Sequence, residues 1–325
     1  MPTVAPLDLD GHCVAAAWIS GIPHFALADG AVHRLDNGHK TAQAHDGLLC
    51  ATPALDGKSL LTSGEDGRVC ALAADGAVTQ LAGIGRKWVT ALAAGPRGAL
   101  AFASGRVAHV LPSPGGEIRE IAHPRSVEGL AFAPKGLRLA VARYNGATLH
   151  FPAAAGKPVE LEWAGAHTGV TFSPDGNFLV TAMQENALHG WKLADGKHMR
   201  MAGYPAKVKS LSWSAKGRWL ASSGAPAAIV WPFQTRDGPI GKAPAELGTR
   251  GDTMVTCVAF HTTDEILAIG YGDGMVLAAR VADAKEVLLR RAGKGAVTTM
   301  AWDGEGRRIA FGTEAGDCGV IDVAG

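Results

Sequence analysis

A short pattern that recurs about every 40 residues limits the fold of this chain more than any other feature of its sequence, because internal repeats of 20–50 residues are typical of solenoids and propellers. Each copy has an apolar residue, a second apolar residue three positions later and often an aromatic residue five positions later. The clearest copies occupy residues 127–132, 208–213, 255–260 and 297–302. Weaker copies begin at Cys13, Leu48, Val89 and His167, which gives eight copies in all.

The second and fourth positions after each start test this register, because they did not define it. All of these residues are small: Ala15, Cys50, Ala91, Gly129, Gly169, Ser210, Cys257 and Thr299 at the second position, and Ala17, Thr52, Ala93, Ala131, Thr171, Ser212, Ala259 and Ala301 at the fourth. Side chains alternate between the two faces of a strand, so one face of each copy is closely packed and the other carries bulk. We interpret each copy as the innermost strand of a propeller blade, where sheets crowd around an axis.

The residues after each copy predict three further strands separated by tight turns. Asp56-Gly57, Asp175-Gly176 and Asp303-Gly304 follow inner strands, and Asn145-Gly146 and Asp273-Gly274 mark a second turn. Such dipeptides favour hairpins, and the chain's 43 glycines fit many of them. Four antiparallel strands per repeat form a propeller blade. We therefore predict an all-β propeller with eight four-stranded blades, with seven blades as the alternative.

Several of these segments resemble the WD40-repeat family. They are Ser173-Pro174-Asp175-Gly176, the segment at residues 63–69, and the third-strand residues Trp191 and Trp231. The resemblance covers essentially the whole chain and implies degenerate, bacterial-type WD40 repeats, since Lys192 and Pro232 stand where the family has aspartate after tryptophan. The family's hydrogen-bonded set of a loop histidine, a strand hydroxyl, a turn acid and a tryptophan is best matched by His167, Thr181, Asn186 and Trp191.

The two ends of the chain predict how the last blade is completed. We expect residues 1–325 to form a single propeller domain. The copy beginning at Val297 is followed by only two further strands before the chain ends, and an open sheet edge is an aggregation liability. Residues 3–9 precede the first inner strand and are predicted to supply the missing outer strand. Pro6 is acceptable there, because an outer strand is a sheet edge.

Composition excludes some classes of partner. The 31 basic and 30 acidic residues give a net charge of +1, whereas a generic nucleic-acid coat or a polybasic membrane binder needs a large excess of one sign. No apolar stretch approaches the roughly 20 residues that span a bilayer, and the first residues lack a basic region typical of a secretory signal. The five scattered cysteines favour reduced thiols. We therefore expect a cytoplasmic protein that binds no membrane and whose partner is a protein rather than a nucleic acid. A short single strand stacked on Trp88 stays the alternative.

The histidines and cysteines do not predict a metal site. His33, Cys70 and His189 occupy similar third-strand positions in different blades. Packed sheets lie about 10 Å apart, whereas metal ligands lie about 2 Å from the ion, so these residues cannot share one. No pair of acids or nucleophile motif stands out either. We expect no metal, no cofactor, no catalytic residues and no enzymatic activity. Two alternatives stay open: a metal-handling protein, and an enzyme of the hydrolase or lactonase kind centred on the channel.

The loops predict a binding face. In WD40-like blades, the loops joining strands two and three and those joining successive blades emerge on the same face. The chain's three tyrosines all fall there, together with Trp88 and several basic residues, and tyrosine, tryptophan and arginine are enriched in binding hot spots. The predicted partner-binding residues are Arg86, Lys87, Trp88, Arg106, Arg125, Arg143, Tyr144, Tyr204, Lys207 and Tyr271.

The residues from Arg86 to Tyr144 in this set are predicted to form one patch on blades three and four. The predicted function is a non-enzymatic scaffold that binds an acidic or phosphorylated segment of a protein partner. The alternative interpretation is that these loops are an ordinary solvated surface, on which basic residues are common.

Overall fold

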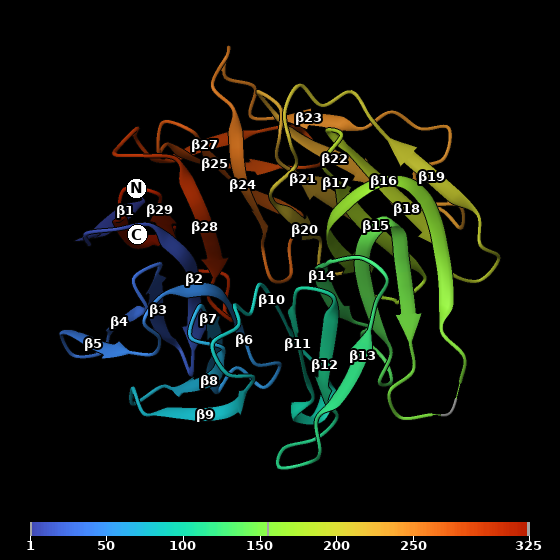
Figure 1. Cartoon of the computed structure of the whole chain (residues 1–325). Helices are drawn as coiled ribbons and strands as arrows, with labels where there is room; N and C mark the ends of the chain where they lie inside the picture. Colours follow the sequence, from blue (N-terminus) through green and yellow to red (C-terminus); the bar gives the residue numbers. More distant parts are fainter. Residues whose placement is uncertain (1, 155, 324–325) are drawn as a thin grey trace. The chain divides into compact units, whose positions relative to one another are not determined.

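The computed structural model describes residues 2–154 and 156–323, and this part of the chain is all-β apart from one short 3-10 helix, Pro96–Gly98 (Figure 1). Three four-stranded sheets come first along the chain: β2 (Cys13–Ile19), β3 (Ile22–Leu27), β4 (Ala31–Leu35) and β5 (His39–Gln43); β6 (Leu48–Pro53), β7 (Ser59–Gly64), β8 (Arg68–Ala73) and β9 (Val78–Gly83); and β10 (Ala91–Ala94), β11 (Leu100–Ser104), β12 (Val107–Leu111) and β13 (Arg119–Ala122).

A six-stranded sheet and three more four-stranded sheets follow. The six-stranded sheet contains β14 (Val127–Phe132), β15 (Leu139–His150), β16 (Val159–Phe172), β17 (Phe178–Met183), β18 (Ala187–Lys192) and β19 (His198–Met201). The others are β20 (Leu211–Trp213), β21 (Trp219–Ser222), β22 (Ala228–Pro232) and β23 (Ala245–Leu247); β24 (Val255–Phe260), β25 (Ile266–Tyr271), β26 (Val276–Arg280) and β27 (Glu286–Arg290); and β28 (Val297–Trp302), β29 (Arg308–Thr313) and β30 (Asp317–Asp322) with β1 (Thr3–Asp8). Sheets of consecutive antiparallel strands give the fold of a β-propeller.

The number of sheets is seven, so the prediction of eight separate blades is wrong and the alternative of seven holds. All eight predicted inner strands are nevertheless present, and two of their repeats share the six-stranded sheet. The first half of β15 pairs with β14 and the second half with β16, and the turn between the halves has positive φ at Asn145 (66°) and Gly146 (126°). β16 pairs with β15 as far as Ala166 and with β17 from His167 onward, so it joins the two repeats without a break.

The chain divides into two compact units. Unit one comprises Met1–Ala28, His33–Lys40 and Gly203–Gly325, and unit two comprises Asp29–Val32 and Thr41–Ala202. In each unit, apolar side chains fill the space between successive sheets. In unit two, for example, Val127, Leu130 and Leu139 pack against Ala101 and Val110 of the preceding sheet. The expectation of a single domain stays a prediction.

The small residues of the inner strands allow these strands to approach one another closely. A Cβ atom on Gly129 of β14 would lie 3.0 Å from the Cα atom of Gly169 of β16, which is too close for a larger residue. In unit one, the hydroxyl of Ser212 accepts a hydrogen bond from the backbone N–H of Phe260 (2.9 Å), and that of Thr299 accepts one from Ala16 (3.0 Å). Small residues at these positions therefore join one inner strand to the next.

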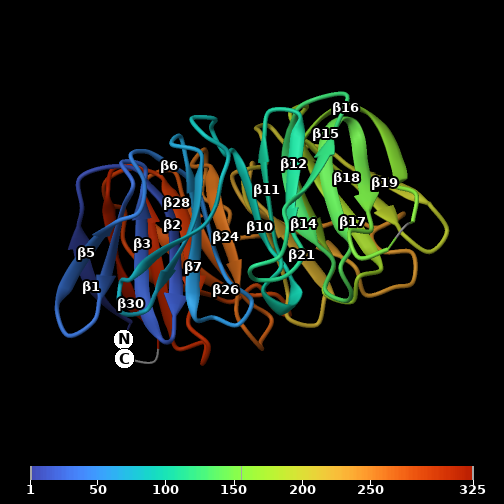
Figure 2. The same cartoon turned by 60° about the horizontal axis from the view of Figure 1, so that its bottom comes forward.

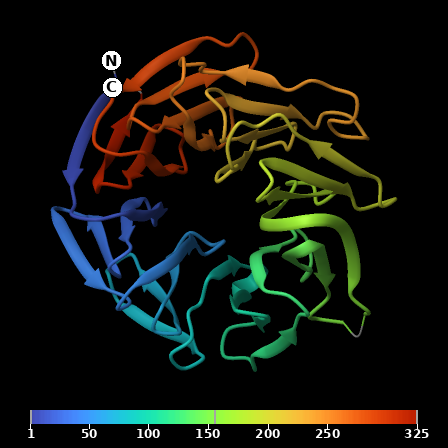
Figure 3. The same ribbon diagram turned by 45° about the horizontal axis from the view of Figure 1, so that its top comes forward.

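The N-terminal strand lies beside the last strand of the chain. β1 pairs antiparallel with β30 from Thr3 opposite Asp322 to Asp8 opposite Asp317, and the two ends of the chain lie close together (Figure 3). The backbone N–H of Leu9 extends the contact by donating to Gly316 O (2.8 Å). Residues 3–8 therefore occupy the outer position of this sheet, the place to which the sequence analysis assigned residues 3–9. Among the described residues, no helix is long and apolar enough to cross a membrane.

Candidate interaction site

Six of the predicted partner-binding residues are exposed on unit two and come from four separate segments. Arg86, Lys87 and Trp88 lie between β9 and β10, Arg106 lies between β11 and β12, Arg125 lies between β13 and β14, and Tyr144 lies within β15. Trp88 is 56% exposed and Tyr144 is 49% exposed, which is unusual for such large aromatic side chains. We call these six residues the basic patch.

Backbone hydrogen bonds hold the segments of the basic patch next to one another. The Thr90 N–H donates to Ala103 O (3.0 Å), which places the segment containing Trp88 beside the end of β11. The His123 N–H donates to Arg106 O (2.8 Å), which places Arg125 close to Arg106. The Val127 N–H donates to Gly105 O (2.8 Å). Figure 2 shows these segments at one end of β10, β11, β12 and β14.

Strand register brings the last member of the patch to the same end. Val127, at the beginning of β14, lies opposite Arg143 in β15, and Tyr144 is the next residue along the chain. The repeat register was the only sequence signal that could place these distant segments together, and the backbone hydrogen bonds support that placement.

The four cations of the basic patch have no partner of their own. In residues 2–154 and 156–323, no ion pair or side-chain hydrogen bond engages Arg86, Lys87, Arg106 or Arg125. The charge of Lys87 does reach a neighbouring group. Burial lowers the pKa of His109, Glu120 opposes this shift, and the positive charge of Lys87 adds to it. Unpaired guanidinium and ammonium groups bind carboxylate and phosphate anions through charge-assisted hydrogen bonds.

Arg143 does not belong to this surface, and its assignment to the patch is wrong. Its side chain is buried, and its Nε donates to Thr148 Oγ1 (3.0 Å) while a second nitrogen donates to Tyr144 O (3.0 Å). The guanidinium also forms an ion pair with Glu160, whose carboxylate accepts a hydrogen bond from Thr148 (2.8 Å). Arg143 therefore joins the second, third and fourth segments of its repeat.

Tyr204 and Tyr271 are also buried, which corrects their assignment as binding residues. The Tyr204 hydroxyl lies 2.6 Å from Ser222 Oγ and accepts a hydrogen bond from Trp231 Nε1 (2.7 Å), and burial raises its pKa to about 12. Tyr271 is fully buried and donates to Gly248 O. Both hydroxyls connect a loop to the strands of the repeat that follows it. Lys207 lies in unit one and is half-buried.

The predicted histidine network is present in part, and a more complete one was missed. His167 Nδ1 lies 2.7 Å from Thr181 Oγ1, and the ring of His167 lies 5.7 Å from that of Trp191. In the repeat beginning at Leu48, His45 contacts both Asp66 Oδ1 (3.0 Å) and Thr62 Oγ1 (2.9 Å).

Hydrogen bonding in this second network changes the acidity of Asp66. Burial alone would raise the pKa of Asp66, but hydrogen bonds from the Arg68 backbone N–H and from the side chains of His45 and Arg68 lower it to about 2. The spacing of a loop histidine, a strand threonine and a turn aspartate was visible in the sequence. This set was not predicted, because Cys70 stands at the third-strand position where WD40 repeats have tryptophan.

The histidines and cysteines are dispersed in the structure. No group of three or more histidine, cysteine, aspartate or glutamate side chains with metal-binding geometry occurs among the residues that the structure describes. The nearest approach is a pair, His33 Nδ1 and His39 Nε2, which lie 2.8 Å apart on neighbouring strands. All five cysteines are thiols, and Cys13 and Cys318 are within hydrogen-bonding reach of each other.

Comparison with known proteins identifies the fold and no family. No protein-family model matches the chain, and no curated protein matches it. Among solved structures, the crystal structure of the computationally designed Ika8 protein is similar with a TM-score of 0.77 and 19% sequence identity over 97% of each chain. A likeness at this identity supports the propeller fold alone. The resemblance to WD40 repeats stays a prediction.

Proposed function

We propose that this protein is a non-enzymatic interaction platform of the WD40 type, and that its basic patch binds an acidic or phosphorylated segment of a protein partner. One observation carries this proposal: four unpaired cations from three loops and the exposed side chains of Trp88 and Tyr144 belong to neighbouring segments at one end of the same strands. A propeller is consistent with a scaffold, because a rigid framework with variable loops suits partner binding.

The chemistry of the patch favours a carboxylate or phosphate partner. An arginine guanidinium binds either group through two parallel hydrogen bonds, and three arginines contribute to this surface. Exposed tryptophan and tyrosine add apolar contact area at little cost in conformational entropy. A net charge of +1 over the whole chain makes a protein segment a better candidate than a long nucleic acid, which requires an extended basic surface.

Reversing two charges of the patch tests the proposal. We expect the double variant Arg106→Glu with Arg125→Glu to lose the partner that the wild-type chain recovers in affinity purification followed by mass spectrometry. Removing a central hot-spot residue typically costs about 2 kcal/mol or more of binding free energy, so the loss of recovery will be clear. The interaction of the wild type should also weaken as salt is raised, because its charges are exposed.

A control variant separates a specific effect from a change in total charge. Arg236→Glu with Lys242→Glu makes the same change in net charge at exposed positions of unit one. This control should keep the partner. Recovery of the same partner by a folded Arg106→Glu, Arg125→Glu protein would overturn the proposal and leave the patch as an ordinary solvated surface.

A further inference from the structure

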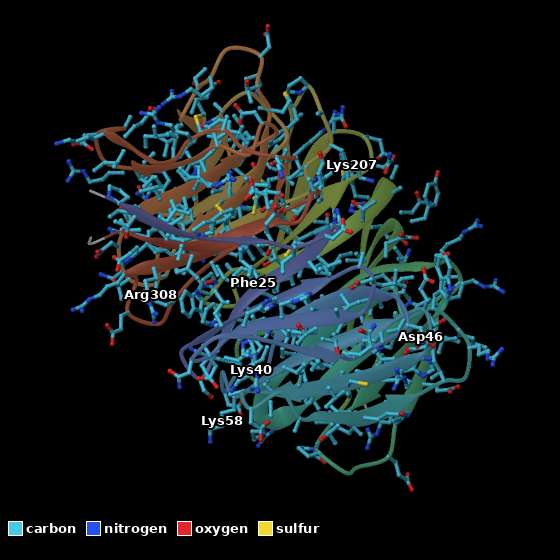
Figure 4. The ribbon with its side chains drawn as sticks, turned by 90° about the vertical axis from the view of Figure 1, so that its left-hand side faces the viewer. Phe25, Lys40, Asp46, Lys58, Lys207 and Arg308 are labelled. Atoms are coloured by element: carbon cyan, nitrogen blue, oxygen red, sulfur yellow. The ribbon has the colours of Figure 1, made fainter. Side chains whose placement is uncertain are left out.

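A hollow of about 350 Å³ lies in unit two between two turns. One wall is the turn at residues 54–59, which joins β6 to β7, and the other is the turn at residues 95–99, which joins β10 to β11. We call this feature the two-turn hollow. β6 separates it from Asp46, and Figure 4 shows Asp46 and Lys58 at opposite ends of this part of the molecule. Arg86, Lys87 and Trp88 precede β10, whereas the turn at residues 95–99 follows it, so the basic patch and the hollow lie at opposite ends of this strand.

The lining of the hollow is largely apolar. Leu55 is 68% exposed and Leu81 is 39% exposed, and both border the hollow. Leu61 and Leu100 are buried and lie behind them. An apolar group that covers these exposed leucines removes their surface from water, which lowers the free energy of the system.

Two opposite charges face the hollow from different turns. Asp56 lies in the first turn, where its Oδ1 accepts a hydrogen bond from the Lys58 N–H (3.0 Å). Arg97 lies in the second turn and is exposed. Within the described part of the chain, Arg97 forms no ion pair or hydrogen bond through its side chain, so the two charges border the hollow without neutralising each other.

The backbone at Arg97 is unusual for an arginine. Arg97 has φ 56° and ψ 34°, Gly98 has φ 75°, and the Ala99 N–H donates to Pro96 O (3.1 Å). Arg97 and Gly98 are the two central residues of the turn that this hydrogen bond closes, and both have left-handed backbone. Such a turn favours asparagine or glycine at the first of its two central positions. An arginine there destabilises the fold relative to asparagine. Residues held in such conformations cluster at active sites and ligand clamps, where the surrounding structure holds them in place.

We infer that the two-turn hollow binds a small zwitterion with an aliphatic body, such as a short peptide with free ends. Leu55 and Leu81 contact the aliphatic part, Arg97 binds the carboxylate, and Asp56 binds the ammonium group. A water molecule occupies about 30 Å³ of liquid, so the hollow holds about a dozen groups of that size, which is the scale of a dipeptide.

The backbone of the two turns makes an extended protein segment a poorer ligand. The Ala54 N–H donates to Ser59 O (2.9 Å), and the Gly95 N–H donates to Ala99 O (2.7 Å). These main-chain groups are already paired within their turns, so they offer no free strand edge to which a chain could add. The hollow therefore offers apolar contact and two charged contacts, which match a small molecule with two charged ends.

Calorimetric titration with the dipeptide leucyl-alanine and two blocked forms tests this assignment. The wild type should bind the free dipeptide with a Kd of about 1 mM, as expected for so small a ligand. Acetylation of its amine removes the partner of Asp56, and amidation of its carboxyl group removes the partner of Arg97. Each blocked form should bind about tenfold more weakly, as expected for the loss of one charged hydrogen bond.

Two variants test which end of the dipeptide each charged side chain binds. Arg97→Asn should weaken binding of the free dipeptide about tenfold. Binding of the amidated form should stay unchanged, because that form has no carboxylate for Arg97 to bind. Asp56→Asn keeps an acceptor for the Lys58 N–H and should weaken binding of the free dipeptide. Binding of the acetylated form should stay unchanged, because that form has no ammonium group for Asp56 to bind. Absence of saturable binding by the wild type in the millimolar range, or equal binding of free and blocked dipeptides, would overturn the assignment.

A stability measurement separates loss of binding from loss of folding. Arg97→Asn should raise the melting temperature, because asparagine tolerates the left-handed conformation better than arginine does. A variant that is more stable and binds more weakly cannot owe its weaker binding to unfolding. Arg86→Gln, in the basic patch, should leave dipeptide binding unchanged, so the result is independent of the proposed partner. Undiminished dipeptide binding by Arg97→Asn contradicts the assignment.

Discussion

At the scale of single residues, the aromatic position of the repeat has a hydrogen-bonding role in addition to its bulk. The indole N–H of Trp18 donates to Ala301 O (2.9 Å), and that of Trp302 donates to Ala259 O (3.0 Å). In each case a tryptophan at the fifth position after a repeat start bonds to the fourth-position carbonyl of the preceding inner strand. The guanidinium carbon of Arg308 lies over the ring of Trp18, 4.4 Å from its centroid. A tryptophan at this position therefore joins two sheets.

Tyr204 provides a residue-scale prediction about stability. Tyr204→Phe removes the hydroxyl shared by Ser222 and Trp231 and leaves both groups buried without that partner. A buried polar group left unpaired costs about 1–3 kcal/mol, so the midpoint of denaturant unfolding should fall clearly. The matched control is Tyr144→Phe, which alters an exposed hydroxyl and should leave unfolding unchanged. Equal midpoints for the two variants would contradict the structural role of Tyr204.

The sequence predicted where the tyrosines lie and failed to predict which way they face. Tyr144 lies within β15, Tyr204 lies between β19 and β20, and Tyr271 ends β25. All three are therefore in or beside a turn of the repeat, yet only Tyr144 is exposed. A loop position fixes the path of the backbone, whereas burial depends on partners from other strands, such as Trp231 for Tyr204. Arg143 shows the same limit, because its partner Glu160 belongs to the fourth segment of the repeat, which the pattern defines least well.

At the scale of elements, the repeat pattern located the inner strands well and the sheet boundary between two of them poorly. Five of the eight predicted starts coincide with the first residues of β2, β6, β14, β24 and β28. The boundary between the repeats beginning at Val127 and His167 disappeared because β16 continues from one into the other. Tyr144 pairs with Ala166 just before the inner strand begins, and this contact depends on two loops that no periodicity describes.

The N-terminal strand provides a prediction at this scale. Removing residues 2–8 deletes β1 and leaves β30 as the unpaired edge of its sheet. The melting temperature should fall, because six residue pairings are lost, and the exposed edge should increase aggregation on heating. Differential scanning calorimetry with light scattering measures both effects. A melting curve identical to that of the full chain would show that β1 contributes nothing to stability.

At the scale of the whole molecule, buried histidines are distributed over several sheets and have one physical consequence in common. Burial lowers the pKa of each member of the set His24, His109, His123, His150, His167 and His189. The pKa falls to about 4 for His123 and about 3 for His189. Neither ring nitrogen of His189 finds a hydrogen-bond partner among the described residues, and its ring stacks on Trp163 at 4.1 Å. Burial therefore favours the neutral form of these side chains in the folded state.

The stability of the protein should consequently fall on mild acidification. Between pH 6.5 and about 4, the unfolded chain binds a proton at His123 and at His189 and the folded chain does not, so the free energy of unfolding decreases as pH falls. Each such histidine contributes up to about 1.4 kcal/mol per pH unit within this window. Protonation of Asp66 lowers the free energy of unfolding further at lower pH, between its usual pKa of 3.8 and its folded pKa of about 2.

Replacing His189 tests this origin directly. His189→Phe keeps a flat ring against Trp163 and removes one titrating group, so urea unfolding of the variant should lose less stability than the wild type between pH 7 and pH 5. The backbone oxygen of His189 still accepts the hydrogen bond from Thr181 Oγ1 (3.2 Å), so the strand pairing does not depend on the imidazole. His39→Phe, at an exposed site, is the control for a general effect of histidine loss. Parallel pH profiles for the wild type and His189→Phe would show that burial of this imidazole does not limit stability in acid.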